Sequence, residues 1–431
     1  MFRALTRQCI ITTIKKQLQP PILGCAILSG RMSAILVGAT VYDNLEKEAV
    51  IKVLDEGWLG VGKYAKEFED KVAKYVGHKY GIVTNSGSSA LLLAVQSLEL
   101  PKGSKVIVCA CGFPATVSPI IHAGLIPIYV DAEMTSYSID PHEIAKATMQ
   151  HDAKAVVFAH TVGNVANMDK VMAIAKLHNL LVIEDICDAL GAMWGKKQVG
   201  SFGDISCVSF YPSHHITAGG LGGMMLTSND DYATRAISLR DWGKTHNSPT
   251  YYDAYTTDER NFVMVDSISY DYRYTYSHIG YNLKPADLNC AFGIAQMDKL
   301  DSFIEKRNAN YQKLFDLFNR SPYFVMPKHH KEATPSWFNY PVVVKENTIF
   351  TRDQLVKYFE KHEIRCRLFF AGNITRQPAF KGTGIILGDL PVSDLLMKQA
   401  FLIACHPALT DDNILHIGKV LDNFLHEKDI N

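Results

Sequence analysis

The sequence predicts an α/β protein in which a large, mostly parallel sheet domain is followed by a small C-terminal α/β domain. From residue 64 onward, apolar extended segments rich in β-branched residues alternate with helical segments, as in a sheet covered by helices on both faces. After residue 300 the pattern changes to a long helix, an extended segment and another helix. We therefore predict a large domain over residues 43–300 and a small one over residues 301–431.

The alternation can be followed segment by segment. Helices are predicted for FEDKVAKYVG, SSALLLAVQSL, TVSPIIHAGL and MDKVMAIAKLHN, and strands for YGIVTNS, KVIVCACGF, IPIYVDA, AKAVVFAH, LLVIED, ISCVSFY and GGMMLTS. Residues 106–130 are apolar enough to raise the question of a membrane span, but Gly112, Pro114, Pro119 and His122 interrupt them. Strand, helix, strand is therefore the prediction, and no membrane is expected as a partner.

The small domain has its own signals. DSFIEKRNANYQKLFDLFNR predicts a long helix, and WFNYPVVV predicts a strand. Thr351 and Gln354 then stand at the spacing of a capping box, which predicts the start of a further helix.

Residues 1–42 form a basic extension that we expect to lie outside the fold proper. They include five Lys or Arg residues and no acid before Asp43. An organelle targeting segment, a disordered extension and an upstream start codon, with Met32 as the real start, all fit this composition.

The overall composition favours a small polar substrate. Forty-four basic residues balance forty-four acidic ones, so nothing general favours nucleic acid or an anionic membrane. The nine cysteines are an odd number and lie mostly in apolar runs, which is typical of reduced thiols in the cytoplasm. The close pair Cys109 and Cys111 lacks the further ligands that a metal needs, so we expect no metal site.

Two polar segments follow predicted strands. The segment 85–89, Asn-Ser-Gly-Ser-Ser, precedes a helix whose free N–H groups could bind a phosphate, although such a segment is more often only a helix cap. Asp185 follows the apolar strand LLVI. Its carboxylate could pair with a cationic ring nitrogen such as that of pyridoxal phosphate, and a capping or structural acid is the alternative.

A third segment, SFYPSHHITAGGLGG, frames two adjacent histidines, which in isolation would usually be structural. The ordered set SGSSA, CGFPATV, EDICDALG, SFYPSHH and YSHIGYNLK resembles the DegT/DnrJ/EryC1/StrS family of sugar aminotransferases and dehydratases. The resemblance runs from about Val37 to near the C-terminus. It implies the pyridoxal phosphate-dependent transferase fold of type I, similar to aspartate aminotransferase, and a homodimer.

His214 decides which subgroup the chain resembles. Most of the family has at this position a lysine that holds the cofactor covalently, and here no lysine lies between Lys197 and Lys244. The subgroup with histidine is that of the nucleotide-sugar 3-dehydratases. The motifs EGWLGVG, FAHTVGN, SLRDWG, PSWF and RLFFAGNITRQPAF are similar to its CDP-4-keto-6-deoxyglucose branch, which belongs to deoxysugar and lipopolysaccharide O-antigen biosynthesis.

The resemblance assigns roles to individual residues. His214 is the base, Ser88, Ser89 and Ser209 bind the cofactor phosphate, Asp185 the pyridine nitrogen, Asp188 the ring-hydroxyl side and Phe113 the ring face, while Asn282 reaches the phosphate of the neighbouring subunit; Trp58, His215, Tyr281, Arg367 and Arg376 are candidate substrate contacts. A histidine cannot bind the cofactor covalently, so free pyridoxamine phosphate or unanchored pyridoxal phosphate is expected. His214, with a pKa near neutrality, would remove a proton so that the C3 hydroxyl of a nucleotide-diphosphate 4-keto-6-deoxyhexose leaves.

The cysteine pattern departs from the CDP-sugar branch. That branch adds three cysteines after RDWG, which hold an iron-sulfur cluster together with the counterpart of Cys187, whereas no cysteine lies here between Cys207 and Cys290. We therefore expect no cluster. The alternative branch acts on GDP-4-keto-6-deoxymannose and regenerates pyridoxamine phosphate with glutamate. The nucleotide stays open, and a non-catalytic descendant of the family is the alternative from another class.

Overall fold

An eight-stranded sheet in the order β1-β9-β8-β5-β4-β2-β3-β16 forms the centre of the protein. The computed structural model describes residues 34–245 and 262–429. The strands of the sheet are β1 (Tyr80–Thr84), β2 (Lys105–Cys109), β3 (Ile126–Val130), β4 (Ala153–Ala159), β5 (Leu181–Asp185), β8 (Ile205–Ser209), β9 (Gly223–Thr227) and β16 (Ile385–Ile386). The six strands from β8 to β16 are parallel, and β9 runs antiparallel to both β8 and β1. The prediction of a mostly parallel sheet is confirmed.

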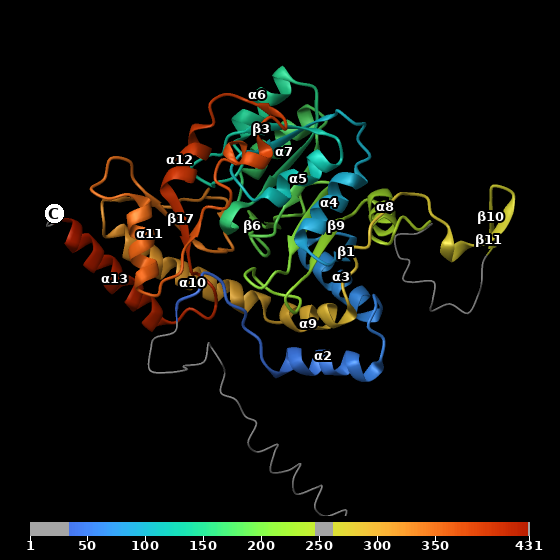
Figure 1. Cartoon of the computed structure of the whole chain (residues 1–431), viewed down its shortest axis with the longest axis horizontal. Coiled ribbons are helices and arrows are strands. Elements are labelled where there is room, and N and C mark those ends of the chain that lie inside the picture. The colour runs from blue at the N-terminus through green and yellow to red at the C-terminus, as the bar shows by residue number, and fades with distance from the viewer. Residues whose placement is uncertain (1–33, 246–261, 430–431) are drawn as a thin grey trace, which may run out of the picture. The chain divides into compact units, whose positions relative to one another are not determined.

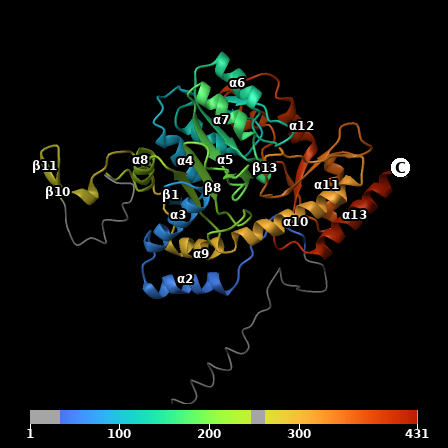
Figure 2. The same cartoon turned by 180° about the vertical axis from the view of Figure 1, so that it is seen from behind.

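Helices cover both faces of this sheet (Figures 1 and 2). Val106 and Val108 of β2 belong to one buried cluster, whereas Ile107 and Cys109 belong to another, because successive side chains of a strand point to opposite faces. The first cluster is closed by α4 (Gly87–Ser97), α5 (Pro114–His122) and α8 (Asp230–Arg240), and the second by α3 (Lys63–Val76), α6 (Pro141–Gln150), α7 (Met168–Leu177) and α9 (Asp287–Met297).

The C-terminal part of the chain builds a second, four-stranded antiparallel sheet in the order β12-β14-β17-β15. Its strands are β12 (Phe324–Val325), β14 (Tyr340–Val344), β15 (Arg367–Leu368) and β17 (Ala400–Ile403), and its helices are α10 (Leu300–Asn319), α11 (Arg352–Lys361), α12 (Pro391–Gln399) and α13 (Asp411–Asp429). The predicted capping box at Thr351 and Gln354 opens α11. The division into two domains at residue 300 stays a prediction, since Ile35–Asn431 form one compact unit.

Smaller elements complete the described fold. They are α2 (Asn44–Glu56), which packs on α9, the sheet of β6 (Met193–Trp194), β7 (Lys197–Gln198) and β13 (Ala333–Thr334), the hairpin of β10 (Phe262–Val265) and β11 (Ile268–Asp271), and the 3-10 turns η1 (Thr161–Gly163), η3 (Tyr272–Tyr274), η4 (Ile374–Arg376) and η5 (Pro378–Phe380). Within residues 34–245 and 262–429 no helix is long and apolar enough to cross a membrane. The apolar run 106–130 is β2, α5 and β3, as predicted.

The compact unit begins earlier than the predicted boundary at residue 43. Ile35 is 5% exposed and pairs with Ile364 in an isolated parallel bridge. Residues 35–42 are therefore part of the fold, because burial of Ile35 and Val37 holds them to it. Residues 1–33 of the predicted extension lie outside the described residues.

Two consecutive carboxylates end β5 and fix the loops that follow the sheet. Glu184 is fully buried and accepts hydrogen bonds from the backbone N–H groups of Gly200, Phe202 and Gly203, at 2.6–2.8 Å. Its fourth partner is Nε2 of His160, at 3.2 Å. The backbone N–H of His160 donates to the carbonyl of Asp185. A buried carboxylate with this many donors is satisfied, so β5 has a fixed end from which Asp185 projects.

Candidate active site

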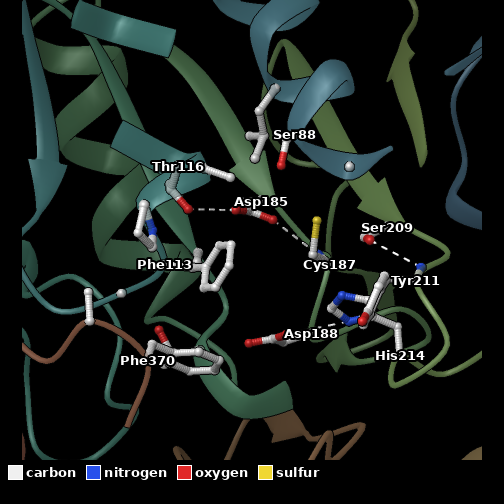
Figure 3. A pocket seen from close by; sticks show the side chains of 18 of the residues that line it. Ser88, Phe113, Thr116, Asp185, Cys187, Asp188, Ser209, Tyr211, His214 and Phe370 are labelled. Atoms are coloured by element: carbon white, nitrogen blue, oxygen red, sulfur yellow. Dashed lines mark hydrogen bonds and ion pairs between the residues drawn. The ribbon is translucent and has the colours of Figure 1, made fainter. Parts of the chain in front are cut away.

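A cavity of about 970 Å³ lies at the carboxyl ends of the parallel strands. Its walls come from the segments that follow β1, β2, β4, β5 and β8, and residues 367–380 of the C-terminal part close the remaining side. Figure 3 shows the labelled side chains converging from these separate segments. Ligands in open α/β sheets bind at this edge of the sheet.

The start of α4 forms one end of the cavity. Ser86 caps the helix by accepting a hydrogen bond from the N–H of Ser89, and Ser88 and Ser209 both line the cavity. A Cβ atom on Gly87 would lie 2.6 Å from the Cβ of Ser209, so only glycine allows the helix to start this close to β8. Free helical N–H groups beside two hydroxyls suit a phosphate group.

Asp185 points into the cavity with both oxygens hydrogen bonded (Figure 3). Oδ2 accepts from the Thr116 hydroxyl at 2.8 Å, and Oδ1 accepts from the N–H of Cys187 at 3.1 Å. With 5% exposure and two donors the carboxylate is fixed in one orientation. Sequence reasoning missed Thr116, although it stands in the CGFPATV motif three residues after Phe113 and so on the same side of the first turn of α5.

His214 and Asp188 form a neighbouring pair in which neither group is charged. Their nearest atoms, Nδ1 and Oδ1, are 3.6 Å apart. Burial, together with the Asp185 carboxylate, raises the pKa of Asp188 to about 8. Burial, with the positive charge of Arg307, lowers the pKa of His214 to about 3. The expected pKa of His214 near neutrality is therefore wrong, because that value applies to an imidazole in water.

Aromatic side chains form the apolar walls. Phe113 is 57% exposed, and its ring lies 6.4 Å from that of Phe370 in an edge-to-face arrangement. The ring of Phe338 stacks on His214 at 5.0 Å between centroids. Neither Phe370 nor Phe338 was predicted, because their positions beside the cavity follow from how residues 335–380 pack on the large sheet.

The cavity gathers some of the predicted site residues and excludes others. Those that line it are Ser88, Phe113, Asp185, Asp188, Ser209, His214 and Arg367. Those outside it are Ser89, Trp58, His215, Tyr281, Asn282 and Arg376. Ser89 donates to the side chain of Asn85, His215 hydrogen bonds with the carbonyl of Ser336, and Arg376 is paired with Asp394. These contacts point the three side chains away from the cavity lining.

The sequence pattern of the DegT/DnrJ/EryC1/StrS aminotransferase family matches residues 41–422. The chain belongs to this family. The resemblance found in the sequence is thereby confirmed, and with it the α/β fold of the pyridoxal phosphate-dependent transferases. Pyridoxal phosphate or its amine is the cofactor of this family, and the start of α4, Asp185 and Phe113 all line the cavity.

Two relatives and one solved structure illustrate the similarity. Lipopolysaccharide biosynthesis protein RfbH of Salmonella typhimurium is 38% identical over 391 residues, which are 88% of this chain and 89% of the relative. The dTDP-4-dehydro-2,6-dideoxy-D-glucose 3-dehydratase of Saccharopolyspora spinosa is 36% identical over 396 residues, or 89% and 85%. A crystal structure of GDP-4-keto-6-deoxymannose-3-dehydratase with a trapped PLP-glutamate geminal diamine has a TM-score of 0.80 at 26% identity, covering 90% of this chain and all of that one.

The Asp188→Asn variant tests whether the Asp188 carboxyl group is protonated, and so uncharged, in the folded protein. Between about pH 4 and 8 Asp188 is protonated in the folded protein and ionised in the unfolded chain, so its contribution to the free energy of unfolding falls as pH rises. Asparagine does not titrate. Urea unfolding of the cofactor-free proteins should show the variant gaining roughly 3 to 4 kcal/mol relative to the native chain between pH 5 and 8, since each pH unit contributes at most about 1.4 kcal/mol.

The exposed Asp55 supplies the control for that measurement, because its carboxyl group stays in water in both states. The Asp55→Asn variant should show the same stability difference from the native chain at pH 5 and pH 8. An Asp188→Asn difference that is equally independent of pH would show that Asp188 ionises normally in the folded protein.

Proposed function

We propose that this protein removes the 3-hydroxyl group of a nucleotide-linked 4-keto-6-deoxyhexose, with His214 as the base. One observation carries the proposal: among residues 34–245 and 262–429, no lysine lines the cavity, and an imidazole lies there beside Asp188. Aminotransferases of this cofactor need a lysine that binds it covalently and moves protons. A histidine keeps only the second ability, which favours dehydration over amino transfer.

The chain's own groups have distinct parts in this reaction. The start of α4, Ser88 and Ser209 bind the cofactor phosphate, and Asp185 holds the pyridine nitrogen protonated. When bound, pyridoxamine phosphate supplies an amine that condenses with the sugar ketone and a ring that accepts electrons. Nδ1 of His214 is buried, which leaves Nε2 to accept a proton from the cofactor's C4′ carbon. The low pKa keeps this imidazole unprotonated and ready to act as a base.

The two branches of the family differ in what completes the reaction: an iron-sulfur cluster in one, and glutamate as amino donor in the other. We propose that glutamate restores the amine form of the cofactor and that no iron-sulfur cluster takes part. Cys187 lines the cavity, and in the described part of the chain no three His, Cys, Asp or Glu side chains are grouped to hold a metal. The sequence adds no cysteine between Cys207 and Cys290. The solved relative that holds glutamate on its cofactor supports the same route.

A homodimer with shared sites is the proposed assembly. Asn282 is exposed and lies outside the cavity of its own chain. The β10–β11 hairpin exposes apolar side chains, with Phe262, Met264 and Ile268 each more than 60% exposed. A second chain that covers this hairpin could receive Asn282 at its phosphate site.

Dehydration is tested by incubating the protein and pyridoxamine phosphate with CDP-, GDP- and dTDP-linked 4-keto-6-deoxyhexoses and detecting loss of water by mass spectrometry. One nucleotide sugar should be dehydrated, and His214→Asn should lower that rate by about 10²- to 10⁴-fold while retaining the cofactor. His215→Asn is the matched control, because His215 lies outside the cavity. Dehydration at the native rate by His214→Asn would refute His214 as the base.

Cofactor regeneration is tested by analysing anaerobically purified protein for metal and by adding amino acids. The protein should contain no stoichiometric iron or acid-labile sulfide, because too few thiolates are available. Glutamate should convert bound pyridoxal phosphate to the amine, as followed by absorbance, and a D-glutamate sample is the control. Stoichiometric iron together with turnover that requires a reductase would contradict this proposal.

Shared sites are tested by mixing the His214→Asn and Asn282→Ala variants. Each homodimer has two defective sites, whereas a mixed dimer has one site with both residues native, so mixing should restore dehydration. Sedimentation measures the assembly of each sample. A fully active monomer, or no activity in mixed dimers of two variants that fold normally, would exclude the shared site.

A further inference from the structure

Arg307 of α10 is a buried cation whose contacts are all backbone carbonyls. Its side chain is 1% exposed. Nη1 donates to the carbonyl of Phe338 at 2.7 Å, and Nη2 donates to the carbonyl of His214 at 2.8 Å. Longer bonds reach the preceding carbonyls of Trp337 and Ser213, at 3.5 and 3.4 Å. One guanidinium group therefore joins two segments that are more than a hundred residues apart in the sequence.

This arrangement differs from that of the other deeply buried arginine. Arg240 is 3% exposed and forms an ion pair with Glu69 at 2.8 Å. In the described part of the chain, no carboxylate lies within ion-pair distance of Arg307. Burying a cation without a carboxylate partner is unfavourable, and here hydrogen bonds to backbone carbonyls offset part of that cost. The rigid fork of the guanidinium group suits the simultaneous binding of two carbonyls.

The two segments that Arg307 joins carry the stacked pair at the cavity wall. Phe338 and His214 both line the cavity, and their rings stack at 5.0 Å with an interplanar angle of 25°. Nδ1 of His214 makes only a long contact, 3.6 Å from Oδ1 of Asp188, and the imidazole also interacts with the backbone of Cys187, so these contacts leave part of the orientation to other groups. Its direction depends on its backbone, which Arg307 holds, and on the ring of Phe338, whose backbone Arg307 also holds.

We propose that Arg307 is a positioning residue for His214: its guanidinium group locks the His214 and Phe338 segments together and so aims the imidazole at the reacting atoms. The kinetic part of this inference rests on the proposed function. The charge of Arg307 has a second effect in the same direction, since it lowers the pKa of His214 and helps to keep the base unprotonated. Arg307 itself does not line the cavity.

Arg307→Lys and Arg307→Met test this in the holoenzyme. Lysine retains the charge, but its single ammonium group cannot donate to the carbonyls of both segments as the two Nη groups of arginine do. Methionine removes the charge and leaves a side chain of similar length. Both variants should lose roughly 10- to 100-fold in kcat, with KM changed less than about threefold, because the base is misplaced while the substrate still binds. Arg240→Lys is the matched control. It weakens the contacts of another buried arginine, which lies outside the cavity, and should leave kcat near the native value.

A spectroscopic measurement separates positioning from general stability. With ¹³C-labelled histidine rings, the His214 signal, identified by its loss in His214→Asn, should be shifted upfield by the stacked ring of Phe338. Phe338→Leu sets the unstacked value, and it should also lower kcat. Both Arg307 variants should move the signal towards that value, whereas Arg240→Lys should leave it in place.

The outcomes distinguish the two hypotheses. Folded Arg307 variants with native kcat and a native His214 signal would overturn the positioning role. If Arg307 variants do not fold, Phe338→Leu decides: native kcat there would show that the stacked pair does not orient the base. If the native protein dehydrates no nucleotide sugar, the proposed function fails, and the His214 signal still tests Arg307.

Discussion

The fixed end of strand β5 is the constraint on which the rest of the site depends. Glu184 and Asp185 are neighbours, so their side chains point to opposite sides of the sheet. Glu184 binds the loop at residues 200–203 and His160. With that side satisfied, Asp185 is free to present its carboxylate to the cavity, where Thr116 and the N–H of Cys187 orient it. One side of the strand end is structural, and the other is available for chemistry.

Burial then determines the charge of each group around Asp185. Asp188 and His214 are largely removed from water, which raises the pKa of Asp188 to about 8 and lowers that of His214 to about 3, so both are neutral near pH 7. A neutral imidazole can accept a proton, and a neutral neighbour does not hold it as an ion pair. Arg307 supplies a positive charge close to His214 without lining the cavity, and Arg367, which does line it, acts on the pKa of His214 in the same direction. Electrostatics and geometry at the base thus have a common origin in the packing of α10.

Much of the fold and part of the site could be predicted because the information is local. Hydrophobic periodicity placed the strands and helices, and the capping box placed the start of α11. The motifs gave the family and the seven predicted residues that line the cavity. Motifs do not show where neighbours in sequence diverge in space: His214 faces the cavity, whereas His215 is turned towards Ser336, and its role as a substrate contact stays a prediction. The identity of two adjacent residues does not show that their side chains point in different directions.

The sequence by itself determined the alternation of strands and helices, the absence of a lysine between Lys197 and Lys244, and the shortage of cysteines after Cys207. Only the tertiary structure decided that Thr116 holds Asp185, that Phe338 stacks on His214, and that Arg307 joins them. The physical reason is that burial and hydrogen-bond geometry depend on contacts between segments distant in the chain. The pKa of His214 is one such property, since it follows from the loss of water and the nearby Arg307, and not from the residue type.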